Sequence, residues 1–193
     1  MARNNQNQAA RERGCSASFP MIPLIVIILA QVGTSSDNAA LGIAVQELVG
    51  ALGATVADVQ MANLAYSLVA GSCMIAGGMI GVVVGWRKTL RIGLALAILG
   101  EAVVVTATSM DVFTWGGRFL VGLGASFITP SELGLIPALF EGRARATAFG
   151  FVAADSAVSA LVPIPFGILL DAAGFRVTFG VIALYFLGVL IST

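Results

Sequence analysis

The chain alternates long apolar segments with short polar breaks. Six stretches that carry few charges lie near residues 20–45, 60–84, 89–109, 112–135, 146–170 and 175–193. A helix needs about 20 apolar residues to cross the hydrocarbon core of a bilayer, and each stretch is close to that length. The breaks contain glycine and charged residues, and none exceeds about a dozen residues, so they leave no room for a soluble domain. The pattern predicts one all-α membrane domain of six transmembrane helices over residues 20–193.

Composition supports this interpretation and excludes several functions. Hydrophobic residues make up 58% of the chain and charged residues 10%, the reverse of a soluble domain. Ten basic and ten acidic residues give a net charge of zero, so bulk charge indicates no nucleic-acid partner. The chain has no histidine, and no glycine-rich phosphate loop precedes a lysine. We therefore expect no cofactor, no metal site and no enzymatic activity.

The first 19 residues are polar and differ from the rest of the chain. They contain Arg3, Arg11 and Arg13, and their composition predicts a disordered cytoplasmic tail. A basic start before an apolar run is also typical of a signal peptide. Here the apolar run continues past Gly33 without a convincing cleavage site, which favours a retained first helix.

Basic residues gather in alternate breaks, which predicts the orientation in the membrane. The amino-terminal tail and the breaks after the second and fourth segments hold eight of the ten basic residues. These eight are Arg3, Arg11, Arg13, Arg87, Lys88, Arg91, Arg143 and Arg145. The opposite breaks hold Glu47, Asp58, Asp111 and Asp171, with Arg176 as their single base. Because cytoplasmic loops of membrane proteins are enriched in bases, both termini are predicted to be cytoplasmic, in the plasma (bacterial inner) membrane.

Five charged residues fall inside the apolar segments: Asp37, Glu101, Arg118, Glu132 and Asp155. Each costs on the order of 3 kcal/mol at mid-helix, so each is expected to face the bundle interior, water or another charge. Asp37 is followed by Asn38 and lies among small residues that leave space for a cavity. These patterns make Asp37, Asn38, Glu101 and Asp155 candidates for a substrate cavity.

Each of these charges also has an interpretation that involves no transport. Glu101 lies at a depth that would allow it to pair with Arg118 as a purely structural partner. Glu132 lies near the predicted cytoplasmic end of its helix, which favours an interfacial carboxylate. Asp155 could contact a partner chain instead of a substrate. For Asp37 we favour a functional role, because a membrane carboxylate among small residues has few structural uses.

The fourth segment carries a recognisable motif. The run R-F-L-V-G-L-G-A from Arg118 to Ala125 resembles the R-x-x-x-G-x-G-x-A signature of the major facilitator superfamily. The run from Gly78 to Lys88, G-M-I-G-V-V-V-G-W-R-K, resembles the cytoplasmic G-x-L-A-D-R-x-G-R-R loop of that family. Val82 and Val83 stand in place of the Asp and the Arg that follows it.

Three further segments extend the resemblance along the chain. The run after the fourth segment, G-R-A-R-A at 142–146, resembles the family's R-G-R-A, and G-F-R with a later Phe at 174–179 resembles its G-W-R-x-x-F. Pro163 and Gly167 match part of the antiporter pattern G-P-x-x-G-G. Asp37, Ala44 and Leu48 fit the D-x-T-x-x-N-x-A-L-P pattern of drug:proton antiporters loosely, with Ala, Gly and Gln at the Thr, Asn and Pro positions.

The resemblance implies the amino-terminal six-helix half of a major facilitator transporter, built as two inverted three-helix repeats. It implies proton-coupled export of a small amphipathic molecule, with Asp37 as the titrating group and Arg118 as its modulator. It also implies helix packing and a gating loop formed by Gly78, Gly81, Gly85, Arg87, Lys88, Gly122, Gly124, Pro163 and Gly167.

A chain of this length is compatible with a transporter that works with a second half and with two alternatives. A parallel homodimer, or a complex with a separate six-helix half, would form the central cavity of a full transporter. A lone half is expected to leave Asp37 and Arg118 open to lipid. The alternatives are a non-transporting membrane subunit that binds a partner and an excised half of a longer transporter.

Overall fold

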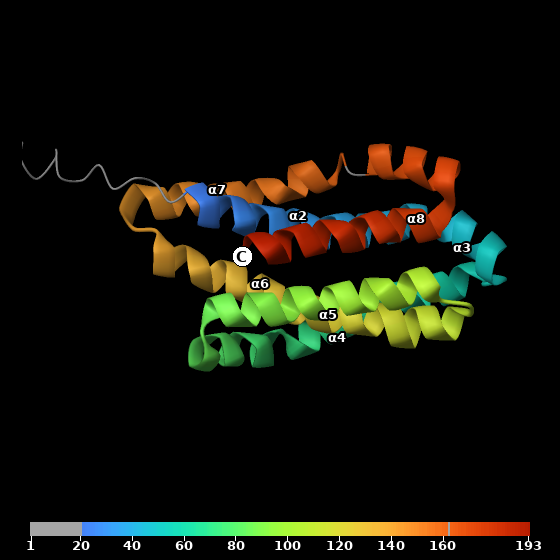
Figure 1. The fold of residues 1–193 in the computed structure, drawn as a ribbon, viewed down its shortest axis with the longest axis horizontal. Coiled ribbons are helices and arrows are strands. Elements are labelled where there is room, and N and C mark those ends of the chain that lie inside the picture. The colour runs from blue at the N-terminus through green and yellow to red at the C-terminus, as the bar shows by residue number, and fades with distance from the viewer. Residues whose placement is uncertain (1–20, 162) are drawn as a thin grey trace, which may run out of the picture.

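A computed structural model describes residues 21–161 and 163–193, and all of its regular structure is helical. The elements are α2 (Met21–Ile43), α3 (Val45–Leu52), α4 (Val56–Val84), α5 (Trp86–Thr106), η1 (Val112–Arg118), α6 (Phe119–Leu139), α7 (Gly142–Ser159) and α8 (Pro163–Ser192). Figure 1 shows the long helices side by side in an elongated bundle. The predicted tail, residues 1–19, lies outside the described residues.

Helix boundaries follow local chemistry. Thr55 caps α4: its hydroxyl accepts from the Asp58 amide at 3.2 Å, and the Asp58 carboxylate accepts from the Thr55 amide at 2.8 Å. Gly85 separates α4 from α5 at φ 102°, a conformation that side chains disfavour. The predicted breaks therefore coincide with turns, except that the short helix α3 extends into the first of them.

Five helices of the described residues are long and apolar enough to cross a membrane: α2, α4, α5, η1 with α6, and α8. The last of these is two helices in one, because Gly174 has non-helical angles (φ 78°, ψ 172°) and the chain reverses there (Figure 1). The part of α8 before Gly174 continues the path of α7, and the part after it runs back along the bundle. The described residues therefore run along the bundle six times.

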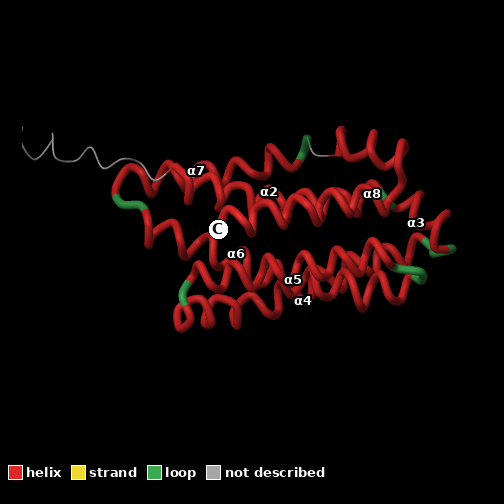
Figure 2. The backbone as a smooth tube through the Cα atoms, viewed as in Figure 1, coloured by secondary structure: helices red, strands yellow, loops and turns green. Residues whose placement is uncertain are grey.

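The fifth pass differs from the prediction of one continuous helix near 146–170. It is interrupted between Ser159 and Pro163, where Figure 2 shows a loop part-way along the bundle. Pro163 and Pro165 have no amide proton to donate to a preceding helical turn, which explains the break. The other loops lie at the two ends of the bundle (Figure 2).

The packing of the six passes has the symmetry of an inverted repeat. The first helix of the second triplet, α6, packs on α4 and α5, while the first helix of the first triplet, α2, packs on α7 and α8. The third helices of the two triplets, α5 and α8, pack on each other. Exchanging the triplets leaves this set of contacts unchanged, and α2 and α6 run in opposite directions (Figure 1).

Charges divide the bundle into two ends. The exposed bases Arg87, Lys88, Arg91, Arg143 and Arg145 lie around the α4–α5 and α6–α7 turns, which we call the basic end. The other end, which we call the acidic end, holds Glu47, Asp58, Asp111 and Asp171.

We predict that the basic end faces the cytoplasm. In a Cys15→Ser, Cys73→Ser background, cysteines introduced singly at Ala57 and Thr108 should react with a membrane-impermeant maleimide in intact cells. Cysteines at Val84 and Ala146 should react only after the membrane is opened. All four positions are exposed, so access alone decides the result. Labelling of the second pair only would invert the orientation.

Close helix approach depends on glycine at particular positions. A Cβ atom added at Gly77 of α4 would overlap the carbonyl oxygen of Ser126 on α6, whereas one added at Gly71 would meet nothing within 4 Å. We predict that Gly77→Ala lowers stability by about 1–3 kcal/mol, because one of the two helices must shift. Gly71→Ala, the matched control on the same helix, should be neutral or slightly stabilising. Thermal unfolding in detergent measures both, and equal midpoints would contradict the packing.

Candidate functional site

Arg118 is the centre of a buried charged cluster. It is the last residue of η1, a seven-residue π-helical segment, and its side chain is fully buried. Its Nη1 donates to Oδ1 of Asp37 on α2 at 2.6 Å, and the same atom lies 3.9 Å from Oε1 of Glu101 on α5. A π-helical turn inside a membrane helix is frequently a functional feature. We call Asp37, Glu101, Arg118 and Tyr66 the Arg118 cluster.

Tyr66 of α4 completes the cluster. Its ring lies under the guanidinium group, with the Arg118 Cζ atom 4.7 Å from the ring centroid. Such a contact attracts a desolvated cation by roughly 2 kcal/mol. Tyr66 is not among the site residues predicted from the sequence. The available signal was an aromatic residue with a polar tip among small residues in a membrane segment.

The cluster is not neutral when all three charged groups are ionised. Two carboxylates face one guanidinium, which leaves one net negative charge, and all three side chains are 0% exposed. Several polar atoms have no hydrogen-bond partner among the described residues: Asp37 Oδ2, both Glu101 oxygens, and Arg118 Nε and Nη2. The arrangement therefore has spare donors and acceptors, so Arg118 can change partners without leaving the cluster.

A second polar group surrounds Asp155 of α7. Its Oδ2 accepts from Ser35 Oγ at 2.5 Å and from Gln31 Nε2 at 3.3 Å, both on α2. Ser35 and Asp37 are two residues apart, so they lie about 200° apart around α2. Asp155 therefore contacts one face of α2, while Asp37 projects from another face of the same helix. The structure does not bring these two carboxylates into one cavity.

Two further positions differ from expectation. The interpretation of Glu132 as an interfacial carboxylate is wrong, because its side chain is buried at 1% exposure. Glu132 lies deeper than predicted because α6 extends to Leu139, which places Glu132 two turns inside the helix. Asn38, a candidate for the substrate cavity, is exposed on the outside of this chain.

Gly122 and Gly124, two of the predicted packing residues, lie where neighbouring helices approach closely. A Cβ at Gly122 would lie 2.7 Å from the Tyr66 carbonyl oxygen, and one at Gly124 would lie 2.7 Å from both Ala97 N and Gly93 O. These glycines bring α6 against α4 and α5, and the first of them sets the Tyr66 backbone beside the helix that follows Arg118.

The residues of the predicted gating loop and of the fifth helix differ in how closely other side chains approach them. Gly81 contacts the Trp86 ring, and Gly78 lies near Pro130. Arg87 and Lys88 lie in the first turn of α5. Pro163 begins α8, and a Cβ at Gly167 would meet nothing within 4 Å.

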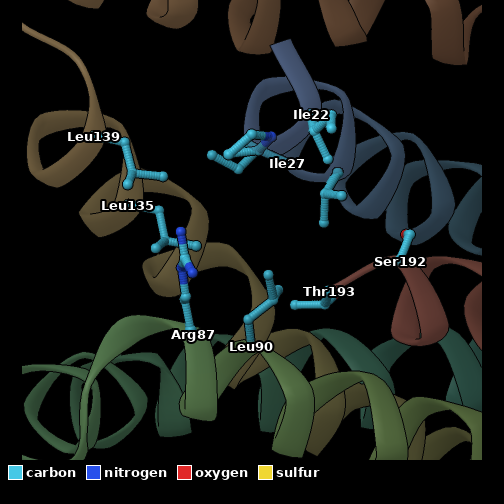
Figure 3. Close-up of a pocket in the computed structure, with 10 residues that line it drawn as sticks. Ile22, Ile27, Arg87, Leu90, Leu135, Leu139, Ser192 and Thr193 are labelled. Atoms are coloured by element: carbon cyan, nitrogen blue, oxygen red, sulfur yellow. The ribbon is translucent and has the colours of Figure 1, made fainter. Parts of the chain in front are cut away.

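A cavity of about 250 Å³ opens at the basic end between α2, α5, α6 and α8 (Figure 3). Its walls are largely apolar, with Ile22, Ile27, Leu90 and Leu135 among them. Arg87 projects from α5 toward Leu135. The Arg118 cluster does not line this cavity.

The family model of the Major Facilitator Superfamily matches residues 27–192. The chain is 30% identical over 158 residues to the methylenomycin A resistance protein of Bacillus subtilis, covering 81% of this chain and 34% of that protein. It is 27% identical over 148 residues to the probable actinorhodin transporter of Streptomyces coelicolor, covering 76% of this chain and 25% of that protein. With the multidrug efflux pump LfrA of Mycolicibacterium smegmatis it shares 36% identity over 108 residues, 55% of this chain and 21% of the pump.

Solved structures agree on the fold. A crystal structure of the peptide transporter POT superposes with a TM-score of 0.77 at 17% identity, covering 88% of this chain and 36% of that one. The chain thus spans about a third of the length of that transporter and of the methylenomycin A resistance protein. The matched family, the buried membrane charges and the inverted packing agree: the chain is a multi-pass membrane protein that belongs to the Major Facilitator Superfamily.

Proposed function

We propose that this chain is the six-helix unit of a secondary transporter that exports a small amphipathic molecule in exchange for protons. The names of its relatives, a resistance protein and an efflux pump among them, support export. The buried ion pair of Asp37 and Arg118, with Glu101 beside it, is the observation that carries proton coupling.

Charge balance is the physical argument. An isolated charge inside a membrane helix costs about 3 kcal/mol on the insertion scale, so a cluster with one excess negative charge is unfavourable there. One proton makes the Arg118 cluster neutral. The group that takes it must be a carboxyl, and Asp37 is the one that lies among small residues of the first helix.

Exchange of partners supplies the coupling step. Protonation of Asp37 removes its attraction for Arg118, and Glu101 is already within 3.9 Å of the same nitrogen. Arg118 then pairs with Glu101, which leaves α2 less tightly bound to η1. Loss of the proton restores the 2.6 Å contact. The equilibrium between the two pairings would thereby bias how α2 packs against α6.

A second six-helix unit completes the transporter in this proposal. Major facilitator proteins place substrate between two six-helix halves, and the alignment with the methylenomycin A resistance protein covers 34% of that protein. The partner in this proposal is a second copy of this chain or another six-helix half. The expectation that Asp37 and Arg118 open to lipid is wrong, because both are 0% exposed within this chain. Shielding these two residues is therefore not a reason for the association.

Exposed apolar side chains are available for such contacts. They are concentrated on α4, whose exposed members include Met61, Leu64, Leu68, Ile75 and Met79. In a membrane they meet either lipid or the partner half. We place the assembly in the bacterial inner membrane with both termini in the cytoplasm, as the charge asymmetry indicates.

Flux in proteoliposomes tests the proposal. The chain alone is reconstituted into vesicles that hold a fluorescent amphipathic dye on one side of the membrane, and a pH gradient is then imposed. We expect dye movement against its gradient that stops when a protonophore dissipates the pH difference, and cross-linked dimers in the active preparation. Dimers that bind dye but do not move it under any gradient would favour the alternative of a non-transporting subunit.

A further inference from the structure

Glu132 lies in a second acidic site that the proposed mechanism does not use. It is on α6, 14 residues after Arg118, which is roughly 20 Å along the helix. Its side chain is 1% exposed, and neither carboxylate oxygen has a hydrogen-bond partner among the described residues. The Arg118 cluster is too far away to neutralise it.

The neighbours of Glu132 are acidic or neutral. Its carboxylate interacts electrostatically with that of Asp155 on α7, and both interact with the Tyr185 hydroxyl of α8. From α2 come the neutral side chains of Gln31 and Ser35, which bond Asp155. Among the described residues the only buried base is Arg118, and it already faces two carboxylates.

The two carboxylates are not equivalent. Asp155 accepts two hydrogen bonds, which stabilise its ionised form. Glu132 accepts none, so an ionised Glu132 would lie in the membrane interior beside a like charge and without a donor. What is missing from this site is one positive charge next to Glu132.

We propose that Glu132 and Asp155, with Ser35 and Gln31, form a binding site for one small monovalent cation, either a proton or Na⁺. All four side chains offer oxygen, the ligand atom of hard cations, once the Gln31 amide turns its Oε1 inward. No cluster of three or more acidic, His or Cys ligands occurs among the described residues.

This inference extends the proposed function, because it adds a second coupling-ion site on helices of both repeats. It can be tested without transport. A binding result would stand even if the chain moved no substrate, and loss of flux in Asp37→Asn would leave the second site intact.

Thermal unfolding of the purified full chain in detergent provides the sodium arm. NaCl replaces choline chloride at constant total salt, near pH 8. If Na⁺ binds, saturating NaCl should raise the midpoint of the original chain by about 5 °C or more. Glu132→Gln should abolish the shift. Glu141→Gln, the same change at an exposed glutamate, should keep it, as should Asp37→Asn.

Proton uptake provides the second arm. In sodium-free, unbuffered detergent solution, the original chain should bind about one proton more than Glu132→Gln between roughly pH 5 and pH 9 if the ligand is a proton. A sodium shift or the extra proton, each lost in Glu132→Gln, supports the site and identifies the ion. Asp155→Asn serves as a second variant should Glu132→Gln not fold. The absence of both effects in the original chain would overturn the proposal.

Discussion

Arg118→Gln is expected to be the most destabilising single substitution in this chain. The change leaves two fully buried carboxylates, Asp37 and Glu101, without a counter-charge inside the bundle. Removing one partner of a buried ion pair typically costs 3–5 kcal/mol, so we expect a loss of about that size. Thermal unfolding in detergent and the yield of folded protein measure it. The reason is electrostatic: the guanidinium is the only buried positive charge among the described residues.

Two variants separate charge from volume in that experiment. Arg118→Lys keeps the charge but loses the planar group that stacks on Tyr66, so it should recover part of the stability. Arg118→Gln combined with Asp37→Asn and Glu101→Gln makes the cluster neutral and should recover more of the stability than Arg118→Lys does. A stability of Arg118→Gln equal to that of the original chain would show that the cluster has no electrostatic role in folding.

Asp37→Asn is expected to fold but to lose proton-driven flux. The substitution strands Arg118 only partly, because Glu101 lies 3.9 Å from the same guanidinium nitrogen and can take over the pairing. Asparagine cannot gain or lose a proton in this range, so the cluster stays fixed in one charge state. We expect proton-driven dye flux to fall by at least about 100-fold, the scale of removing a group that transfers protons, while substrate exchange survives.

Double variants distinguish coupling from a fixed structural pair. If the pair only joins α2 to η1, Asp37→Asn with Arg118→Gln should restore both stability and flux. We expect this double variant to remain inactive in proton-driven transport. Full recovery of that flux would rule out Asp37 as the proton site. Asp37→Asn with Glu101→Gln strands Arg118 completely and should be less stable than Asp37→Asn by roughly 3 kcal/mol.

Much of the architecture could be predicted from the sequence because the bilayer restricts the options. A chain with this composition must satisfy its backbone hydrogen bonds within helices, so apolar length and the intervening glycines and charges locate the passes. The family resemblance, which the run from Arg118 to Ala125 first indicated, is confirmed by the family model over residues 27–192. The glycines of that run bring α6 against α4 and α5. The fifth pass was harder, because apolarity continues through a segment that Pro163 interrupts.

Pairings within the membrane could be predicted only as far as residue type allows. The cost of a charge in the membrane indicates that Asp37, Glu101, Arg118 and Asp155 turn inward, whereas Glu132 was assigned to the interface until the structure showed it buried. Which of them meet depends on the rotation of each helix about its axis, and no pattern in the sequence reports that rotation. The polar residues of α2 illustrate this: Asp37 points to Arg118 while Ser35, two residues earlier, bonds Asp155.

The sequence by itself determined that this chain is a multi-pass membrane protein and that five charged residues fall inside its apolar segments, because hydropathy and charge are properties of residues in order. Only the tertiary structure decided that those charges form two separate groups, that Tyr66 stacks on Arg118, and that Glu132 is buried without a donor. These facts arise from the contact of helices far apart in the chain. Such contacts depend on the packing of small residues at α4, α5 and α6, where a single Cβ atom would move one helix against the next.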